Sequence, residues 1–289
     1  MKTILMLTDF SINAGYVAQY ALALAQKIEA NLLVCNIYQA GALEERAVGE
    51  HLPICLEEQN SIYDIDAVIA HLTARLDEDD QKEAFRPVIT QCSEEGLPGE
   101  ELAHLMSKYN IQLAVISAHS KHNLNGYFEK DHAWDIVEKA NFPVLVIPYQ
   151  ARFEPFKLMA FATVMNYTDI TVLESLTGLA KHTNSEILIS NIAAQPEEDD
   201  DIEKFFNQIP FKITYPKILY HNIKGRDVIS SLKHLCSFID IDLLVIVHRR
   251  RNLLQKMFST SITRKMMSRQ EKPLLVFPCA TVTESLVVL

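Results

Sequence analysis

The chain has 289 residues, of which 48% are hydrophobic, and a formal net charge of −10 at pH 7. This length corresponds to about two domains of ordinary size, and this composition is typical of a globular protein with a large core. The negative charge argues against broad binding to nucleic acids or to anionic membranes. No apolar run approaches the roughly 18 residues of a membrane span.

The cysteines also bear on where the protein works. Five cysteines are scattered along the chain without a C-x-x-C motif. An odd, scattered set is typical of reduced thiols and indicates a cytoplasmic location. The apolar N-terminal stretch is interrupted at Thr8 and Asp9, so it predicts a first strand and not a signal peptide.

The first half of the chain alternates short apolar runs with stretches of helical periodicity. A helix begins near Ser11 or Asn13, either of which can cap it, and runs to about Glu29. The other expected helices are Ile62–Leu76, a stretch from after Gly99 to Tyr109, and Asp131–Ala140. The expected strands are Thr3–Leu7, Leu32–Ile37, Phe85–Thr90, Ile111–Ile116 and Val144–Ile147.

The second half follows the same plan. Asp169 can cap a helix that runs to about His182, a short helix lies near Phe205, and Gly225–Phe238 is a further helix. The tail Thr281–Leu289 ends in apolar residues and either adds an edge strand or covers a groove. The expected strands are Phe156–Ala162, Glu186–Ile192, one within Phe211–Tyr220 that Pro216 breaks or bulges, Ile241–Ile246 and Leu274–Phe277.

Two ungapped alignments relate the halves. Ile111–Pro148 matches Ile241–Pro278, and Lys2–Ile37 matches Lys157–Ile192, so that Thr8 falls on Thr163. Colinear blocks of this length predict a duplicated domain, with domains at 1–148 and 156–289 and a linker at 149–155. The order of elements predicts two α/β domains, each an open parallel sheet of about five strands with helices on both faces.

This order, repeated twice, resembles the tandem members of the universal stress protein family. Thr8-Asp9-Phe10-Ser11 is similar to the hydrophobic-Asp-x-Ser pattern that ends the family's first strand. The resemblance covers nearly the whole chain. It implies a Rossmann-like, adenine nucleotide alpha hydrolase-like fold and a stress-response function.

The same resemblance implies a nucleotide site in the loop after the fourth strand, where the family usually carries Gly-x2-Gly-x9-Gly-Ser/Thr. In repeat one, Ser117, Ser120 and Lys130 stand at the glycine positions, and Asp131 stands at the hydroxyl position. In repeat two the corresponding residues are Val247, Arg250, Thr260 and Ser261. Because all six glycines are absent, we expect at most weak ATP binding and no tightly held cofactor.

The resemblance also gives candidate binding residues. Asp9 would lie at the adenine end of a pocket, or alternatively would only cap the next helix, and repeat two has Val164 at that place. An anion could bind Arg249, Arg250, Arg251 and Ser261 of repeat two, or the arginines form a solvated basic loop. The candidate nucleotide residues of repeat one are Thr8, Asp9, Ser11, Ile37, Ser117, Ser120, Lys130 and Asp131.

Other chemistry has weaker support. His119, His122 and His132 lack the i, i+4 spacing of a zinc helix, and the acidic run Asp77–Asp80 lacks the glycine of an EF-hand loop. Ser117 and His119 lack a G-x-S-x-G elbow. We therefore predict no metal site and no catalytic residues, and favour a protein that is not an enzyme.

Two hypotheses remain for the function. The first is a cytoplasmic stress-response protein that acts through an unknown protein partner or a small ligand, and the second is an adenine-nucleotide-binding module or slow ATPase. Exposed apolar edge strands invite pairing. We therefore expect Val144–Ile147 to pack against Leu274–Phe277 in an intramolecular pseudo-dimer, which could in addition form a homodimer.

Overall fold

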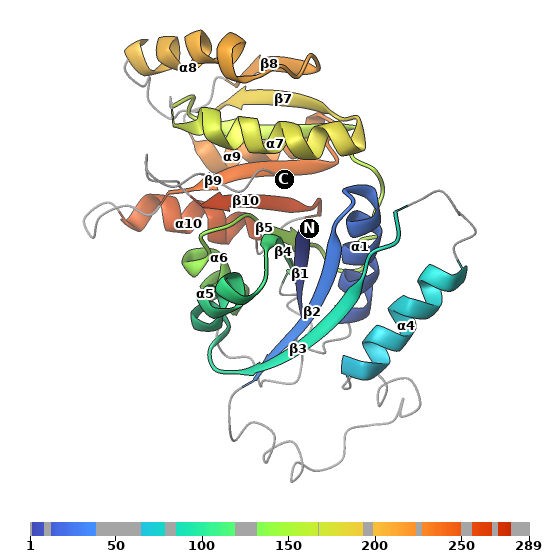
Figure 1. The fold of residues 1–289 in the computed structure, drawn as a ribbon. Coiled ribbons are helices and arrows are strands. Elements are labelled where there is room, and N and C mark those ends of the chain that lie inside the picture. Colours follow the sequence, from blue (N-terminus) through green and yellow to red (C-terminus); the bar gives the residue numbers. More distant parts are fainter. Residues whose placement is uncertain are drawn as a thin grey trace. The chain divides into compact units, whose positions relative to one another are not determined.

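The structure is a computed structural model. It describes residues 2–8, 13–38, 65–78, 85–118, 132–166, 168–192, 199–223, 227–249, 256–267 and 271–278. Contacts divide the chain into two compact units, which we describe one at a time (Figure 1). Unit 1 contains Met1–Ala140 and Tyr149–Phe153, and unit 2 contains Asn141–Pro148 and Glu154–Leu289.

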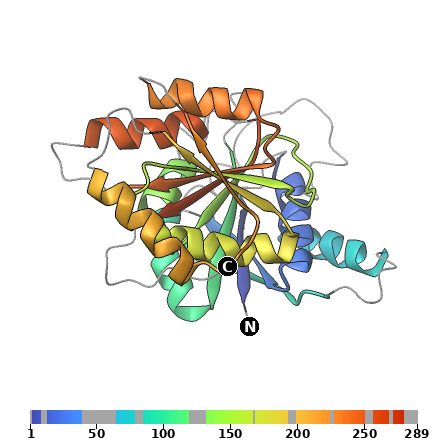
Figure 2. The same cartoon turned by 90° about the horizontal axis from the view of Figure 1, so that it is seen from above.

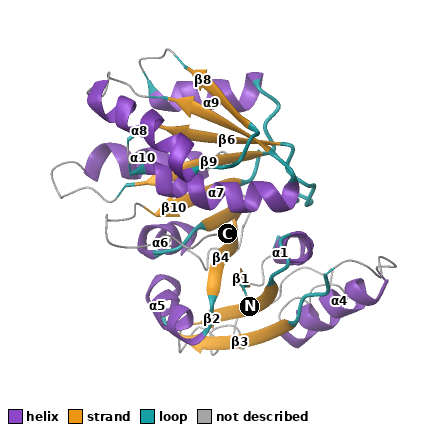
Figure 3. Cartoon of the chain, turned by 45° about the horizontal axis from the view of Figure 1, so that its top comes forward, coloured by secondary structure: helices purple, strands orange, loops and turns teal. Residues whose placement is uncertain are grey.

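Unit 1 is built on a parallel sheet in the order β3-β2-β1-β4. The helices α1 and α4 lie on one side of these strands, and α5 and α6 lie on the other (Figure 3). The described elements in chain order are β1 (Thr3–Thr8), α1 (Ala14–Lys27), β2 (Asn31–Tyr38), α4 (Ile65–Glu78), β3 (Ile89–Glu95), α5 (Pro98–Lys108), β4 (Ile111–Ser117) and α6 (His132–Lys139).

The sequence explains these elements. The strands β1 and β4 are short apolar runs, and Leu5 and Val115 at their centres are completely buried, as expected for strands covered by helices on both faces. The helix α1 places Val17, Ala21 and Leu24 at helical spacing on its buried face. By contrast, β3 is polar and only partly buried, as suits the strand at the end of the order.

Unit 2 contains strands in the order β5-β10-β9-β6-β7-β8. The helices α7 and α8 lie on one face of its sheet, and α9 and α10 lie on the other (Figure 2). The elements are β5 (Val144–Ile147), β6 (Leu158–Thr163), α7 (Asp169–Thr183), β7 (Glu186–Asn191), α8 (Asp199–Lys212), β8 (Ile218–Asn222), α9 (Val228–Phe238), β9 (Leu243–His248), α10 (Lys256–Met267) and β10 (Leu274–Pro278).

The duplication is visible in the topology. The order β8-β7-β6-β9 in unit 2 repeats the order β3-β2-β1-β4 in unit 1. The register repeats as well, because Thr8 pairs with Asn36 and Thr163 pairs with Asn191. Ten strands in a mostly parallel arrangement, interspersed with helices, confirm the predicted α/β fold.

The strand β5 belongs to repeat one in the sequence but pairs with a strand of repeat two. It runs antiparallel to β10, with Leu145 opposite Leu275, and by its contacts it belongs to unit 2. The predicted packing of Val144–Ile147 against Leu274–Phe277 is therefore confirmed, whereas the pseudo-dimer stays a prediction. The five strands expected for each repeat are divided as four in unit 1 and six in unit 2.

Two predicted strands were placed wrongly. The third strand begins at Ile89 and not at Phe85, because Pro87 has no N–H to donate to a ladder. In unit 2, Phe211 still belongs to α8, and β8 begins only at Ile218, after Pro216. The predicted role of the tail Thr281–Leu289 lies outside the described residues.

Candidate functional site

Both sheets reverse their strand order at one place. Ligands of open parallel sheets bind at the carboxyl ends of the strands beside such a reversal. In unit 1 this place is the end of β1 and β4, and in unit 2 it is the end of β6 and β9. We call these places switch point 1 and switch point 2.

Three predicted nucleotide-binding residues lie close to switch point 1. Thr8 ends β1, Ile37 is the penultimate residue of β2, and Ser117 ends β4. Because β1 pairs in parallel with both β2 and β4, these three residues lie together at the carboxyl ends of the strands. The other candidates of repeat one lie outside the described residues: Asp9, Ser11, Ser120, Lys130 and Asp131.

A buried asparagine connects the polar groups of switch point 1. The Nδ2 of Asn13 donates to the Oγ of Ser117 at 2.7 Å, and the backbone N–H of Gln150 donates to the Oδ1 of Asn13 at 2.9 Å. Asn13 is 5% exposed. The amide therefore fixes the position of Ser117 and holds the segment that follows β5.

Asn13 does not have the role that the sequence predicted. It stands at the N-cap of α1, but its side chain makes no capping hydrogen bond. A short amide can bond either its own helix or a neighbouring strand, and here the partners on β4 and at Gln150 are used. This contact is not visible in the sequence, because its three residues are far apart in the chain.

Switch point 2 contains a buried ion pair. The Nη2 of Arg249, which follows β9, lies 2.8 Å from both the Oδ1 and the Oδ2 of Asp169 at the start of α7. The hydroxyl of Thr163, at the end of β6, donates to the same carboxylate at 2.5 Å. The side chain of Asp169 is only 3% exposed and that of Arg249 is 22% exposed.

The burial of this pair affects the acid. Desolvation raises the pKa of Asp169 above its ordinary value, and the charge of Arg249 and the hydrogen bond from Thr163 oppose this rise. The sequence predicted Asp169 as a helix cap, which was wrong: Thr168 is the N-cap, and the carboxylate of Asp169 instead bonds Thr163, at the end of β6, and Arg249, which follows β9.

The predicted anion site of repeat two is described only in part. Arg249 lies at switch point 2 with its guanidinium on Asp169. Arg250 and Arg251 lie outside the described residues, and Ser261 lies in α10 without a described side chain. Met257 lies in the same helix without a described side chain, while Met266 and Met267 are buried.

The backbone is strained beside the ion pair. Met165 has a φ of 60°, in the left-handed region that costs a side-chain-bearing residue about 1–2 kcal/mol. Its N–H donates to the Oγ1 of Thr163 at 2.8 Å. Thr163 thus holds both Asp169 and the turn after β6, so the carboxylate and the strained turn are fixed together.

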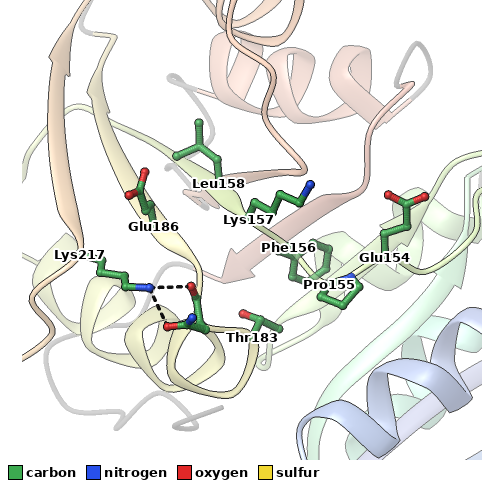
Figure 4. A pocket seen from close by; sticks show the side chains of 9 residues that line it. Glu154, Pro155, Phe156, Lys157, Leu158, Thr183, Glu186 and Lys217 are labelled. Carbon is green, nitrogen blue, oxygen red and sulfur yellow. Dashed lines mark hydrogen bonds between the residues drawn. The ribbon is translucent and has the colours of Figure 1, made fainter.

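A hollow of about 600 Å³ lies in unit 2 at the other ends of its strands (Figure 4). Its lining includes Lys157, before β6, Glu186, which begins β7, and Lys217, before β8. The Nζ of Lys217 donates to the backbone O and the Oδ1 of Asn184. Because this hollow lies at the amino ends of parallel strands, it is a weaker candidate than the switch points.

The described residues include neither a metal-binding cluster nor a membrane-spanning helix. Within the described part of the chain, no group of three or more His, Cys, Asp or Glu residues is arranged to hold a metal ion. His119 and His122 lie outside that part. Among the described helices, none has the length and apolar character that crossing a membrane requires.

Comparison with known proteins gives one family. The family model described as the universal stress protein family matches residues 1–148. No curated protein matches the chain.

Solved structures resemble the chain over nearly its whole length. A universal stress protein from Archaeoglobus fulgidus has 15% identity and a TM-score of 0.65, over 96% of this chain and 98% of that one. A putative universal stress protein from Pseudomonas aeruginosa has 13% identity and a TM-score of 0.57, over 96% and 92%. A functionally unknown protein from Pseudomonas aeruginosa has 12% identity and a TM-score of 0.58, over 96% and 92%. At these identities the likeness concerns the fold.

Proposed function

The chain belongs to the universal stress protein family, and on that premise we propose that it is a cytoplasmic stress-response protein that binds a protein partner or a small ligand and binds ATP only weakly. The observation that carries the proposal is the ion pair between Arg249 and Asp169 at switch point 2. Among the described residues, the alternative of a nucleotide-binding module or slow ATPase has no comparable observation in its favour.

The ion pair matters because Arg249 is one of the arginines predicted to bind an anion, and it is the one that lies within the described residues. A phosphate that took over Arg249 would leave Asp169 buried and ionised without its partner. Removing one member of a buried pair costs several kcal/mol, which an incoming anion would have to supply. Anion binding at Arg249 is therefore unfavourable.

Switch point 1 supports the same proposal. Ser117, at the position of the first family glycine, accepts a hydrogen bond from Asn13 and donates one to the backbone O of Ala118 at 3.2 Å. The hydroxyl is thus already used on both sides by protein groups. A phosphate would have to compete with these bonds.

The missing glycines add a backbone cost. A phosphate-binding loop turns successive N–H groups toward the anion, and glycine permits the conformations that this needs. A side chain in a left-handed conformation costs about 1–2 kcal/mol. Since about 1.4 kcal/mol is a tenfold change in affinity, the replacements at Ser117, Ser120 and Lys130 reduce ATP affinity on the order of a hundredfold or more.

The charge at Asp131 acts in the same direction. An ionised carboxylate cannot donate to phosphate, and two like charges about 5 Å apart repel by roughly 3 kcal/mol at an effective dielectric of about 20. Lys130 beside it offsets a part of that repulsion. We therefore propose that repeat one has lost the phosphate affinity of an intact motif.

The purified protein tests this directly. Nucleotide would be extracted from the as-purified full-length chain, identified by chromatography and expressed per mole of protein, with absorbance near 260 nm as a first indication. We expect far less than one nucleotide per chain. Stoichiometric adenine nucleotide, lost in an Asp9→Ala variant purified in parallel, would overturn the proposal and favour the nucleotide-binding alternative.

A further inference from the structure

Two cysteines lie opposite each other in unit 1. Cys35 of β2 and Cys92 of β3 are direct partners in the parallel register of these strands. Partners in register point to the same face of a sheet, and neighbouring strands lie about 4.7–4.9 Å apart. That spacing falls within the Cα separation of roughly 4.4–6.8 Å that a disulfide spans. Both cysteines are free thiols.

The two thiols differ in exposure and in acidity. Cys35 is completely buried, whereas Cys92 is partly exposed on the strand at the end of the unit 1 order. Their side chains share a hydrogen bond that raises the pKa of Cys35 far above its usual range and lowers the pKa of Cys92. Burial also raises the pKa of Cys35. The accessible sulfur is therefore the more acidic of the two.

Two charged groups lie beside the pair. Glu94, two residues after Cys92 on the same face of β3, accepts a hydrogen bond at 3.3 Å from the Nζ of Lys108 in the last turn of α5. The charge of Lys108 lowers the pKa of Cys92, and the charge of Glu94 opposes this. The hydrogen bond from Cys35 is the larger influence, so the second thiol itself activates the first.

We propose that Cys35 and Cys92 form a reversible redox site at which a hydroperoxide oxidises the dithiol to a disulfide between β2 and β3. The thiolate of Cys92 attacks the peroxide oxygen, the O–O bond breaks, and Cys92 becomes a sulfenic acid while the other oxygen leaves as water or an alcohol. The sulfur of Cys35 then attacks the sulfur of Cys92, forming the S–S bond and releasing water. The peroxide is reduced by two electrons, and the two thiols supply them.

The geometry also indicates that this disulfide is easily reduced. A disulfide needs Cβ atoms about 3.5–4.5 Å apart, which is closer than the ordinary spacing of parallel strands. The strands must approach slightly when the bond forms. A disulfide with such strain is more oxidising and more labile than a structural one, as a reversible site requires.

The chain contains a control for this site. Cys236 in α9 is a free, partly exposed thiol, and burial raises its pKa. Cys236 lies in a helix, so among the described residues it has no cysteine opposite it on a neighbouring strand, as Cys35 has. Cys236 should therefore react with peroxide slowly and without forming an internal disulfide. This proposal is independent of the proposed function.

The test uses the full-length, fully reduced chain treated with hydrogen peroxide. Thiols remaining at each time are alkylated under denaturing conditions, and peptides are analysed by mass spectrometry. We expect a peptide that links Cys35 to Cys92, loss of these two thiols at least tenfold faster than loss of Cys236, and full recovery on adding a thiol reductant. In a Cys35→Ala variant, dimedone should trap the sulfenic acid on Cys92.

Two further variants keep the proposal falsifiable. A chain with Cys55, Cys236 and Cys279 replaced by Ser should behave like the wild type, and Cys92→Ser, at a partly exposed site, should retain its fold and lose the rapid reaction. Equal oxidation rates at Cys92 and Cys236 would overturn the proposal. So would a linkage of Cys92 to any cysteine other than Cys35.

Discussion

The guanidinium of Arg249 bonds both carboxylate oxygens of Asp169 through one nitrogen, at 2.8 Å each, at the carboxyl ends of β6 and β9. The two residues are 80 positions apart in the chain and meet only because α7 and the end of β9 converge at switch point 2. At the place where a parallel sheet binds ligands, this protein has a structural ion pair. That relationship has consequences for stability, for pH dependence and for ATP.

Removing the arginine should destabilise the protein. Arg249→Met leaves the carboxylate of Asp169 buried without its partner. Because the arginine is partly exposed, we expect a loss of about 2–3 kcal/mol in the free energy of unfolding, somewhat below the roughly 3–5 kcal/mol of fully buried pairs. Urea denaturation would measure it, with Lys212→Met, which removes an exposed charge in α8, as the matched control. The control should lose less than about 0.5 kcal/mol. If Arg249→Met loses no more than the control, the pair contributes no stability.

The destabilisation should depend on pH. The pKa of Asp169 is raised by burial, so the folded state binds this proton more tightly than the unfolded state. The stability that this bound proton contributes is therefore complete below the unfolded pKa of about 3.9, and it is lost as the pH rises through the folded pKa of Asp169. Without Arg249 the folded pKa rises further, because the charge that lowers it is gone.

It follows that Arg249→Met should cost more stability at pH 7 than at pH 5. The double variant Asp169→Asn with Arg249→Met has no titrating group at this position and should show no such difference. Denaturation curves of both variants at the two pH values decide the matter. A cost that is the same at both pH values in the single variant would show that Asp169 does not titrate in this window.

Asn13 should have a measurable effect at switch point 1. Asn13→Ala leaves the N–H of Gln150 and the hydroxyl of Ser117 without this partner. Because Gln150 is exposed and Ser117 is partly exposed, we expect a loss of about 1 kcal/mol in the free energy of unfolding, as for an ordinary hydrogen bond. We also expect faster hydrogen exchange at the amide of Gln150. Asn13→Asp retains an acceptor for that amide and should protect it better than Asn13→Ala. Equal exchange in all three proteins would mean that the Gln150 amide is protected by something else.

The antiparallel pairing of β5 with β10 predicts how the cut chain behaves. A protease site at Glu154 separates a fragment carrying β5 from a fragment carrying β10, and their backbone pairing should hold the two together. On size-exclusion chromatography the cut protein should elute with the uncut protein. Leu145→Asp, at a buried position opposite Leu275, should release the fragments or precipitate them. Two soluble, separate fragments without that substitution would contradict the prediction.

Much of the fold could be predicted from the sequence, because the spacing of apolar residues along the chain largely determines which segments form buried strands and helices. The apolar runs Ile111–Ile116 and Val144–Ile147 form strands in the expected places, and the aligned halves predicted the repeated topology. The polar edge strand β3 was misplaced, since ITQCSEE has no apolar periodicity and is defined by its pairing with β2.

The site was harder to predict than the fold. Asp169 was expected to cap a helix because local patterns cannot show that its carboxylate meets Arg249. The pair of Cys35 and Cys92 was hidden for the same reason, since the register of β2 against β3 depends on tertiary structure. Chemistry that depends on residues distant in the chain needs the fold before it can be recognised.

Isothermal titration of the full-length chain with ATP and magnesium measures the proposed loss of phosphate affinity itself. The missing glycines, the hydrogen bonds of Ser117 and the ion pair of Arg249 together predict no binding tighter than about 1 mM at either switch point. A micromolar dissociation constant that is lost on Asp9→Ala would show that repeat one is a working nucleotide site and would contradict the proposed function.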